Sequence, residues 1–190
     1  MTFVIRPVTP DLWPALEDLF GKHGACNGCW CMYWRIGSRY RQRDRSENKA
    51  AFKTIVKRGP PPGLVALDGD KAVGWCQLTP RSDLPWLDRG RATKAIDDRP
   101  VWSISCFYVR RGYRGKGVTA ALIEAALNAA KRARVPALEA YPRDAATHTV
   151  GAFTGFTSTF ARAGFEEVAR HQDGRPMLRY EFKASRKRSP

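Results

Sequence analysis

The sequence predicts a mixed α/β fold with one central sheet, and two observations carry this prediction. Apolar runs of strand length and amphipathic helical stretches follow one another in the order β-α-α-β-β-β-α-β-α-β-β. In the middle of this order, an Asp-Gly-Asp turn at residues 68–70 joins two strands as a hairpin. A hairpin pairs its strands antiparallel, so the chain is not a run of parallel βαβ units.

The first half of the chain is expected to contain one strand, two helices and the hairpin. Thr9 or Asp11 can cap the first helix and Ser46 the second, because short polar side chains accept hydrogen bonds from free helical N–H groups. One glycine and three prolines at 59–62 stop the second helix. The expected ranges are 2–6 for the strand, 10–20 and 46–58 for the helices, and 64–67 and 72–78 for the hairpin strands.

The second half begins with a polar connection and then alternates strands with helices. Thr157 or Ser158 can cap the shorter of its two helices. The expected ranges are 79–99 for the connection, 118–134 and 157–163 for the helices, and 101–109, 137–141, a strand from 164 and 176–182 for the strands.

The composition is typical of one globular domain, since 43% of the 190 residues are apolar and 27% are charged. We expect a single domain over 1–183 and a basic, unstructured tail over 184–190. No window approaches the length of a membrane span and no signal peptide is recognisable, so a cytoplasmic location and no membrane partner are expected. Five cysteines, an odd number, favour reduced thiols over a disulfide framework.

The formal charge of +15 favours an anionic partner such as a phosphorylated cofactor. Residues 35–58 alone carry nine cations against Asp44 and Glu47. The same charge argues against a polycationic substrate. A solvated helix face and a basic tail account for much of the excess, so nucleic acid is a less favoured partner than a small molecule.

Residues 110–119 form the strongest candidate site, with four cations and three glycines between an expected strand and an expected helix. Such a turn can hold phosphate on free N–H groups at the helix start. A P-loop is excluded because no Gly-Lys-Ser/Thr is present. The dinucleotide fingerprint G-x-G-x-x-G/A fits Gly115, Gly117 and Ala120, with Glu139 at the position of a ribose-binding acid. The loop after Val109 is longer than that fold allows.

A third interpretation rests on a resemblance to a known family. Cys-Phe-Tyr-Val at 106–109, followed by Arg-Gly-Lys-Gly-Val at 114–118, resembles the acetyl-CoA motif Gln/Arg-x-x-Gly-x-Gly/Ala of the GNAT N-acetyltransferase superfamily. Arg114 and Gly117 match this motif, and Thr119 replaces its last small residue. Ala-Gly-Phe-Glu at 163–166 resembles the turn after the last helix of the family.

The resemblance implies an acetyl-CoA-dependent enzyme with a mostly antiparallel sheet of about six or seven strands and about four helices. It also implies that the Val109 N–H donates to the thioester oxygen, and that Arg110, Arg111 or Lys116 pairs with the 3′-phosphate of coenzyme A. The implied cofactor-binding residues are Phe107, Tyr108 and Val109 for the pantetheine arm, and Arg114, Gly115, Lys116, Gly117, Val118 and Thr119 for the pyrophosphate.

The catalytic groups are harder to assign. In the superfamily a tyrosine four residues before the Gly-Phe pair often protonates the leaving sulfur, and this chain has Phe160 there. We predict Glu139 as general base, Tyr141 as acid and Ser158 beside the sulfur. The alternatives are a salt-bridged carboxylate, a packing tyrosine and a helix cap, respectively.

The N-terminal region contains a Cys- and Trp-rich segment, which resembles a bacterial subgroup of the family. His23, Cys26, Cys29 and Cys31 have a spacing that could bind zinc, but no paired C-x-x-C motif is present. We therefore expect no metal and assign these cysteines to the packing of an acceptor-site wall.

An aromatic pocket for the acceptor is predicted from Tyr33, Trp34 and Trp86. The leading hypothesis is an N-acetyltransferase that acetylates a primary amine of a small molecule or amino acid by direct attack in a ternary complex. The alternatives are a toxin-like acetyltransferase of aminoacyl-tRNA and a non-catalytic module that binds acyl-CoA or nucleic acid. The sequence leaves the oligomeric state open, with a homodimer among the alternatives.

Overall fold

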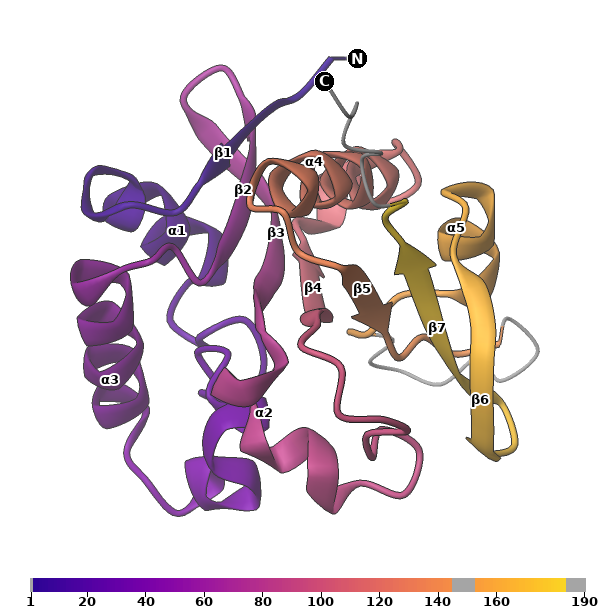
Figure 1. The fold of residues 1–190 in the computed structure, drawn as a ribbon. Coiled ribbons are helices and arrows are strands. Elements are labelled where there is room, and N and C mark those ends of the chain that lie inside the picture. The colour runs from indigo at the N-terminus through magenta and orange to yellow at the C-terminus, as the bar shows by residue number, and fades with distance from the viewer. Residues whose placement is uncertain (1, 145–152, 184–190) are drawn as a thin grey trace, which may run out of the picture.

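The computed structural model describes residues 2–144 and 153–183, which form a seven-stranded sheet with helices on both faces (Figure 1). The strands are β1 (Val4–Pro7), β2 (Gly63–Asp68), β3 (Lys71–Pro80), β4 (Trp102–Val109), β5 (Ala137–Ala140), β6 (Glu166–Gln172) and β7 (Arg175–Glu181). The helices are α1 (Trp13–Phe20), α2 (Tyr33–Ile36), α3 (Arg45–Arg58), α4 (Val118–Arg132) and α5 (Thr157–Arg162). Short 3-10 turns are η1 (Pro10–Leu12), η2 (Gly37–Arg41), η3 (Arg81–Asp83), η4 (Pro85–Arg89) and η5 (Arg111–Tyr113).

The sheet has the strand order β1-β2-β3-β4-β5-β7-β6. Every neighbouring pair is antiparallel except β4 and β5, which are parallel. The prediction of a mixed, mostly antiparallel sheet is therefore confirmed. None of the helices in the described part of the chain has the length and apolar character that a bilayer crossing requires.

The one parallel pair is short, and this positions the site. β4 and β5 are paired only from Trp102 and Leu138 to Ile104 and Ala140. Beyond Ile104, β4 continues to Val109, whereas β5 ends at Ala140. The other edge of β5 pairs with β7. The second half of β4 therefore has an edge that β5 does not cover.

Each face of the sheet has its own apolar core. Leu122, Ile123 and Phe160 bring α4 and α5 onto one face, and all three are completely buried. Leu16 and Phe52 bring α1 and α3 onto the opposite face. Burial of side chains of this size contributes about 1.5–3 kcal/mol each. A smaller cluster on that opposite face contains Leu84, Leu87, Tyr141 and Met177, with Trp34 packed against it.

The structure corrects three predicted details. Helix α3 begins at Arg45 rather than Ser46, because the Asp44 side chain is its cap and accepts from Ser46 N at 2.8 Å. Neither Thr157 nor Ser158 caps α5, whose N-cap is Phe156, without a side-chain hydrogen bond. The first helix starts as a 3-10 turn after Thr9. The predicted tail, 184–190, lies outside the described residues.

Candidate active site

The loop after β4 has the geometry of an anion-binding site. Gly117 is the N-cap of the 15-residue helix α4 and has a left-handed φ of 82°. A Cβ placed on Gly115 or Gly117 would meet nothing within 4 Å, so ligand atoms can approach the backbone closely. The first N–H groups of α4 have no partners within the helix, and the helix dipole makes this end positive.

Three exposed cations surround this loop, namely Arg111, Arg114 and Lys116. The guanidinium of Arg110 is already paired with Asp18 at 2.6 Å. Three residues were predicted to contact the 3′-phosphate. Among the described residues, Arg111 and Lys116 form no ion pair, so these two are available for it. Glycines, free amides and cations together fit a pyrophosphate-bearing ligand.

The edge of β4 that β5 does not cover runs from Ser105 to Val109 and ends next to this loop. Arg110 N donates to Val73 O on the β3 side, so strand alternation turns the N–H groups of Val109 and Phe107 towards the other edge. Phe107 N donates to Phe153 O at 2.5 Å. Residues 153–156 therefore lie along part of the edge that the family resemblance assigns to pantetheine.

A bulge in β4 marks the point where β4 and β5 diverge. The register shifts between Gln77 and Leu78 and leaves Ser105 without a partner in β3. Ser105 O accepts from Trp34 Nε1 at 2.9 Å, and Ser105 Oγ donates to Gln77 Oε1 at 2.9 Å. Gln77 Nε2 in turn donates to Cys31 O at 3.2 Å. The bulge thus fixes the N-terminal segment against the sheet.

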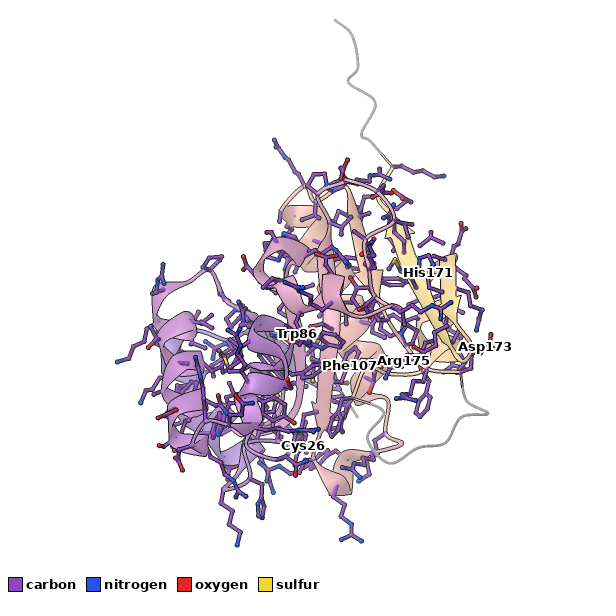
Figure 2. The ribbon with its side chains drawn as sticks, turned by 90° about the horizontal axis from the view of Figure 1, so that it is seen from below. Cys26, Trp86, Phe107, His171, Asp173 and Arg175 are labelled. Carbon is purple, nitrogen blue, oxygen red and sulfur yellow. The ribbon has the colours of Figure 1, made fainter. Side chains whose placement is uncertain are left out.

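The three predicted pocket residues lie in neighbouring elements beside this bulge. Tyr33 is 38% exposed, and its ring centroid is 4.7 Å from that of Trp34. Trp86, labelled in Figure 2, comes from η4 and covers the end of α2. A Cβ on Gly37 would fall 2.1 Å from its ring, so only glycine allows this contact.

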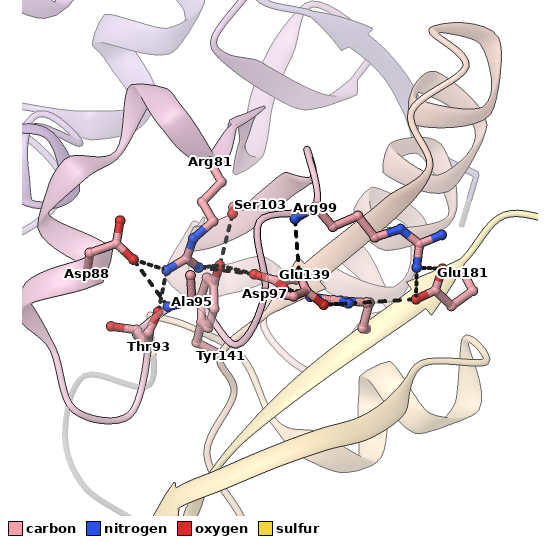
Figure 3. A network of polar contacts seen from close by, with 11 residues as sticks. Arg81, Asp88, Thr93, Ala95, Asp97, Arg99, Ser103, Glu139, Tyr141 and Glu181 are labelled. Atoms are coloured by element: carbon pink, nitrogen blue, oxygen red, sulfur yellow. Dashed lines mark hydrogen bonds and ion pairs between the residues drawn. The ribbon is translucent and has the colours of Figure 1, made fainter.

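Two predicted catalytic residues meet in a buried polar network (Figure 3). Tyr141 donates to Glu139 Oε2 at 2.9 Å and lies 3.0 Å from Ser103 Oγ. Glu139 is 1% exposed and pairs with Arg81 at 3.0 Å and Arg179 at 2.6 Å. This is the salt-bridged carboxylate that the sequence left open as an alternative. Each carboxylate oxygen of Glu139 contacts a different arginine, which favours a structural role over that of a general base.

The remaining members of the predicted catalytic set are placed differently. Burial, followed by the charge of Glu139, raises the pKa of Tyr141 well above its ordinary value, so the phenol stays protonated. Ser158 is exposed on α5, whereas Glu139 and Tyr141 lie on the opposite side of the sheet. Phe160 packs against Phe107 with centroids 6.0 Å apart, inside the core.

Sequence reasoning missed the two arginines of this network. Arg81 also contacts Asp88, and Arg179 contacts Asp97 at 2.7 Å, so the network extends to the 79–99 connection. A lone arginine inside an apolar strand was the available signal for Arg179, because such a charge needs a buried partner.

Cys29 and Cys31 lie in the apolar core between the N-terminal segment and the sheet. Among residues 2–144 and 153–183, no three His, Cys, Asp or Glu side chains are grouped to hold a metal. Trp75 Nε1 donates to Cys31 Sγ at 3.0 Å. Burial, with a contribution from Cys106, raises the pKa of Cys31 well above its ordinary value.

The edge of β4 that β5 does not cover is lined in part by residues 153–156 and ends at a helix start suited to an anion, an arrangement that fits a long, phosphate-bearing ligand. The chain belongs to the acetyltransferase (GNAT) family, whose family model matches residues 27–156, more than half of the chain. Acetyl-CoA is the cosubstrate of GNAT acetyltransferases, and the loop and edge described above fit it. No curated protein sequence matches the chain significantly.

Solved structures share the fold at low sequence identity. The PaiA N-acetyltransferase of Thermoplasma acidophilum, determined in complex with coenzyme A, is 15% identical, with a TM-score of 0.56 over 96% of this chain and 100% of that chain. The polyamine N-acetyltransferase of Drosophila melanogaster is 12% identical, with a TM-score of 0.60 over 95% and 100%. The ribosomal-protein-alanine N-acetyltransferase of Brucella melitensis is 17% identical, with a TM-score of 0.54 over 94% and 99%.

Proposed function

We propose that the chain transfers an acetyl group from acetyl-CoA to a primary amine of a small molecule or amino acid, by direct attack in a ternary complex. The observation that carries this proposal is the position of the α4 start, which is suited to an anion. It lies at the end of the β4 edge that β5 does not cover. A pyrophosphate at the helix start would leave an extended arm to run along this edge. Family membership supports the same ligand.

The chain's own residues would hold and orient acetyl-CoA. The amides from Arg114 to Thr119 would receive the pyrophosphate, and Arg111 and Lys116 would receive the 3′-phosphate. The Val109 N–H would donate to the acyl oxygen. Acetyl-CoA supplies the thioester, whose C–S bond breaks as the N–C bond forms, while the amine loses one proton and the thiolate gains one.

The acceptor would lie beyond the bulge at Ser105, on the side away from the loop over 110–117. Tyr33, Trp34 and Trp86 provide its aromatic wall, and Tyr33 is exposed enough to contact it. Glu139 and Tyr141 act in this proposal as positioning residues, since their network holds the end of β5 and the 79–99 connection in place. Ser158 remains a proposed contact of the cofactor on the α5 side.

Release of free thiol from acetyl-CoA over a broad amine panel tests the proposal. We expect turnover with at least one primary amine, and loss of coenzyme A binding in Gly117→Glu, which adds a carboxylate to the anion site. Gly117→Ala is the matched control, because it carries the backbone strain of a left-handed φ without the charge. Full coenzyme A binding by Gly117→Glu would refute the site.

A second candidate is an acetyltransferase of aminoacyl-tRNA, and the basic surface favours it. Exposed cations line η2 and α3, namely Arg39, Arg41, Arg43, Arg45, Lys53, Lys57 and Arg58. Binding of tRNA through such a surface should weaken steeply with salt, because each neutralised phosphate releases counterions. Failure to retain tRNA at low salt, or a flat salt response, would remove this candidate.

A further inference from the structure

Two neighbouring arginines on the proposed acceptor side have no carboxylate partner among the residues that the structure describes. Arg143 follows β5, and Arg175 begins β7, and both are half-buried. No ion pair of the described residues involves either of them, whereas Arg81 and Arg179 each have carboxylate partners. Asp144 N donates to Gly174 O at 3.1 Å, which brings the chain at Arg143 beside the start of β7 at Arg175. Burial, followed by the charge of Arg143, lowers the pKa of Arg175.

The position of Arg175 follows from strand alternation. Side chains two residues apart lie on the same face, so Arg175 shares a face with Met177 and Arg179. Met177 packs in the cluster that contains Tyr141 and contacts Trp34. Trp34 in turn contacts Tyr33, with ring centroids 4.7 Å apart. Arg175 therefore belongs to the side of the sheet that carries the aromatic wall.

The position of Arg143 connects the pair to β4. Arg143 N donates to Gly155 O at 3.0 Å. A Cβ on Gly155 would lie 3.4 Å from the ring of Phe107, the β4 residue next to the bulge region. The two arginines thus border the place where β4 and β5 diverge.

Nearby acidic groups do not neutralise this pair. Asp144 is already paired with Arg170 at 2.7 Å and accepts from Thr157 at 2.8 Å. Asp173, in the turn before Arg175, is exposed, and no ion pair joins it to either arginine among the described residues. Two like charges kept close in a partly dehydrated place repel each other, and a bound anion relieves that repulsion.

We infer that Arg143 and Arg175 bind an oxyanion on the acceptor, so that the acceptor is an amine that also carries a carboxylate or a phosphate. This inference rests on the proposed acetyl transfer. Arginine presents a planar fork of donors that suits both oxyanions. The aromatic wall would contact the body of the same molecule, with its amine directed towards the bulge of β4. Polyamines, which lack an anion, would be poor acceptors.

Matched acceptors test this inference in the wild-type chain. One set compares ethanolamine with β-alanine and O-phosphoethanolamine, and a second compares L-phenylalaninamide with L-phenylalanine. We expect a higher kcat/KM for at least one anionic amine than for the neutral amine of the same set. If the carboxylate and phosphate compounds differ, the one with the higher kcat/KM identifies the preferred anion. Equal or higher kcat/KM for the neutral members would overturn the inference.

Substitutions locate the effect. Arg175→Gln and Arg143→Gln should each lower kcat/KM for the preferred anionic amine about 10- to 100-fold, mainly through KM, as expected for one charged hydrogen bond. The kcat/KM for the neutral member of the set and the KM for acetyl-CoA should not change. Arg175→Lys should retain part of the activity with the anionic amine. Arg132→Gln, at the exposed C-terminal end of α4, is the control. A parallel loss with both members of a set would refute the role.

A binding measurement separates this inference from the proposed function. If no amine is acetylated, the proposed function fails, and calorimetry with N-acetyl-L-phenylalanine, its amide and inorganic phosphate still tests the subsite. Binding of an anionic probe that is lost in Arg175→Gln would support the oxyanion site. Equal binding of acid and amide, with no binding of phosphate, would exclude it.

Discussion

At the residue scale, Glu139 is a carboxylate held by two buried arginines. Its removal would leave Arg81 and Arg179 without their shared partner. Breaking a buried pair in this way is strongly unfavourable, so Glu139→Ala should lower the free energy of unfolding by about 3–5 kcal/mol. Urea denaturation monitored by tryptophan fluorescence measures this change.

The exposed pair of Arg99 and Glu181 provides the control for Glu139. Its side chains are 41% and 48% exposed, so Glu181→Ala should cost less than about 1 kcal/mol. Similar losses of unfolding free energy for the two variants would contradict the network's role.

The pH dependence of kcat/KM in folded Glu139→Gln tests the role of Glu139 in the reaction. An unchanged pH profile indicates a positioning role, whereas loss of one limb of the profile would identify Glu139 as the base.

Cys29 gives a pH dependence at the same scale. Burial raises the pKa of its thiol to about 11, from a value of 9.0 in the absence of the fold. The folded state keeps its proton longer, so the stability from Cys29 is complete below pH 9 and is lost as the pH rises towards 11. Cys29→Ala should therefore show a shallower alkaline fall in unfolding free energy than the wild type, relative to pH 7. Parallel curves would contradict this expectation.

Single residues were predictable where one local rule determines them. Gly117 was predicted because a turn into a helix beside an anion needs a left-handed φ and no side chain. The partners of Arg179 were not predictable, since Glu139 is 40 residues away and only the fold brings them together. The cap of α3 shows a local competition in which Asp44 rather than Ser46 satisfies the helix start.

At the scale of elements, residues 153–156 lie along the edge of β4 and depend on Gly155. This glycine has a φ of 80°, and a Cβ would lie 3.1 Å from the ring of Phe160. Gly155→Ala should therefore lower the free energy of unfolding through both strain and crowding, by more than about 1 kcal/mol. Thermal and urea unfolding measure the loss.

Gly115→Ala is the matched variant, because Gly115 has a φ of 75° and open space around its Cβ position. We expect a smaller loss of stability than in Gly155→Ala but weaker coenzyme A binding, since Gly115 belongs to the proposed pyrophosphate site. A reversed order of the two stability losses would show that the packing of residues 153–156 against Phe160 contributes little.

Long, periodic elements were predicted well, and so were the short helix α5 and the short strand β5, whereas α2 was missed. The helices expected over 46–58 and 118–134 are observed as α3 and α4 with ends shifted by one or two residues. Helix α2 has four residues, which is too short for a helical period to be visible. The divergence of β4 from β5 was also invisible, because it depends on which strands pair and not on their own sequences.

At the scale of the whole molecule, the sheet order places the proposed phosphate site and the proposed acceptor side on either side of one short parallel pair. Structures with less than 20% identity share the fold, which leaves the acceptor open. The overall charge of +15 indicated an anionic partner from the sequence. It could not indicate where, because exposed cations are spread over η2, α3 and the loop before α4, and only the fold shows which of them lie beside a helix start.

Ligand-linked stability tests the arrangement as a whole. A ligand that binds only the folded chain stabilises it by about 2.7 kcal/mol at 100 times its Kd, which corresponds to a rise in Tm of about 5–11 °C for a chain of this size. We expect acetyl-CoA to give a shift in this range. Dephospho-coenzyme A, which lacks the 3′-phosphate, should require a higher concentration for the same shift.

The same comparison in variants separates the two ends of the ligand. Lys116→Gln and Arg111→Gln should reduce the difference between coenzyme A and dephospho-coenzyme A, because the cations that distinguish them are gone. Arg110→Gln should not, since the guanidinium of Arg110 is paired with Asp18. An undiminished difference in Lys116→Gln and Arg111→Gln would move the 3′-phosphate to other cations while leaving the pyrophosphate site at the start of α4 intact.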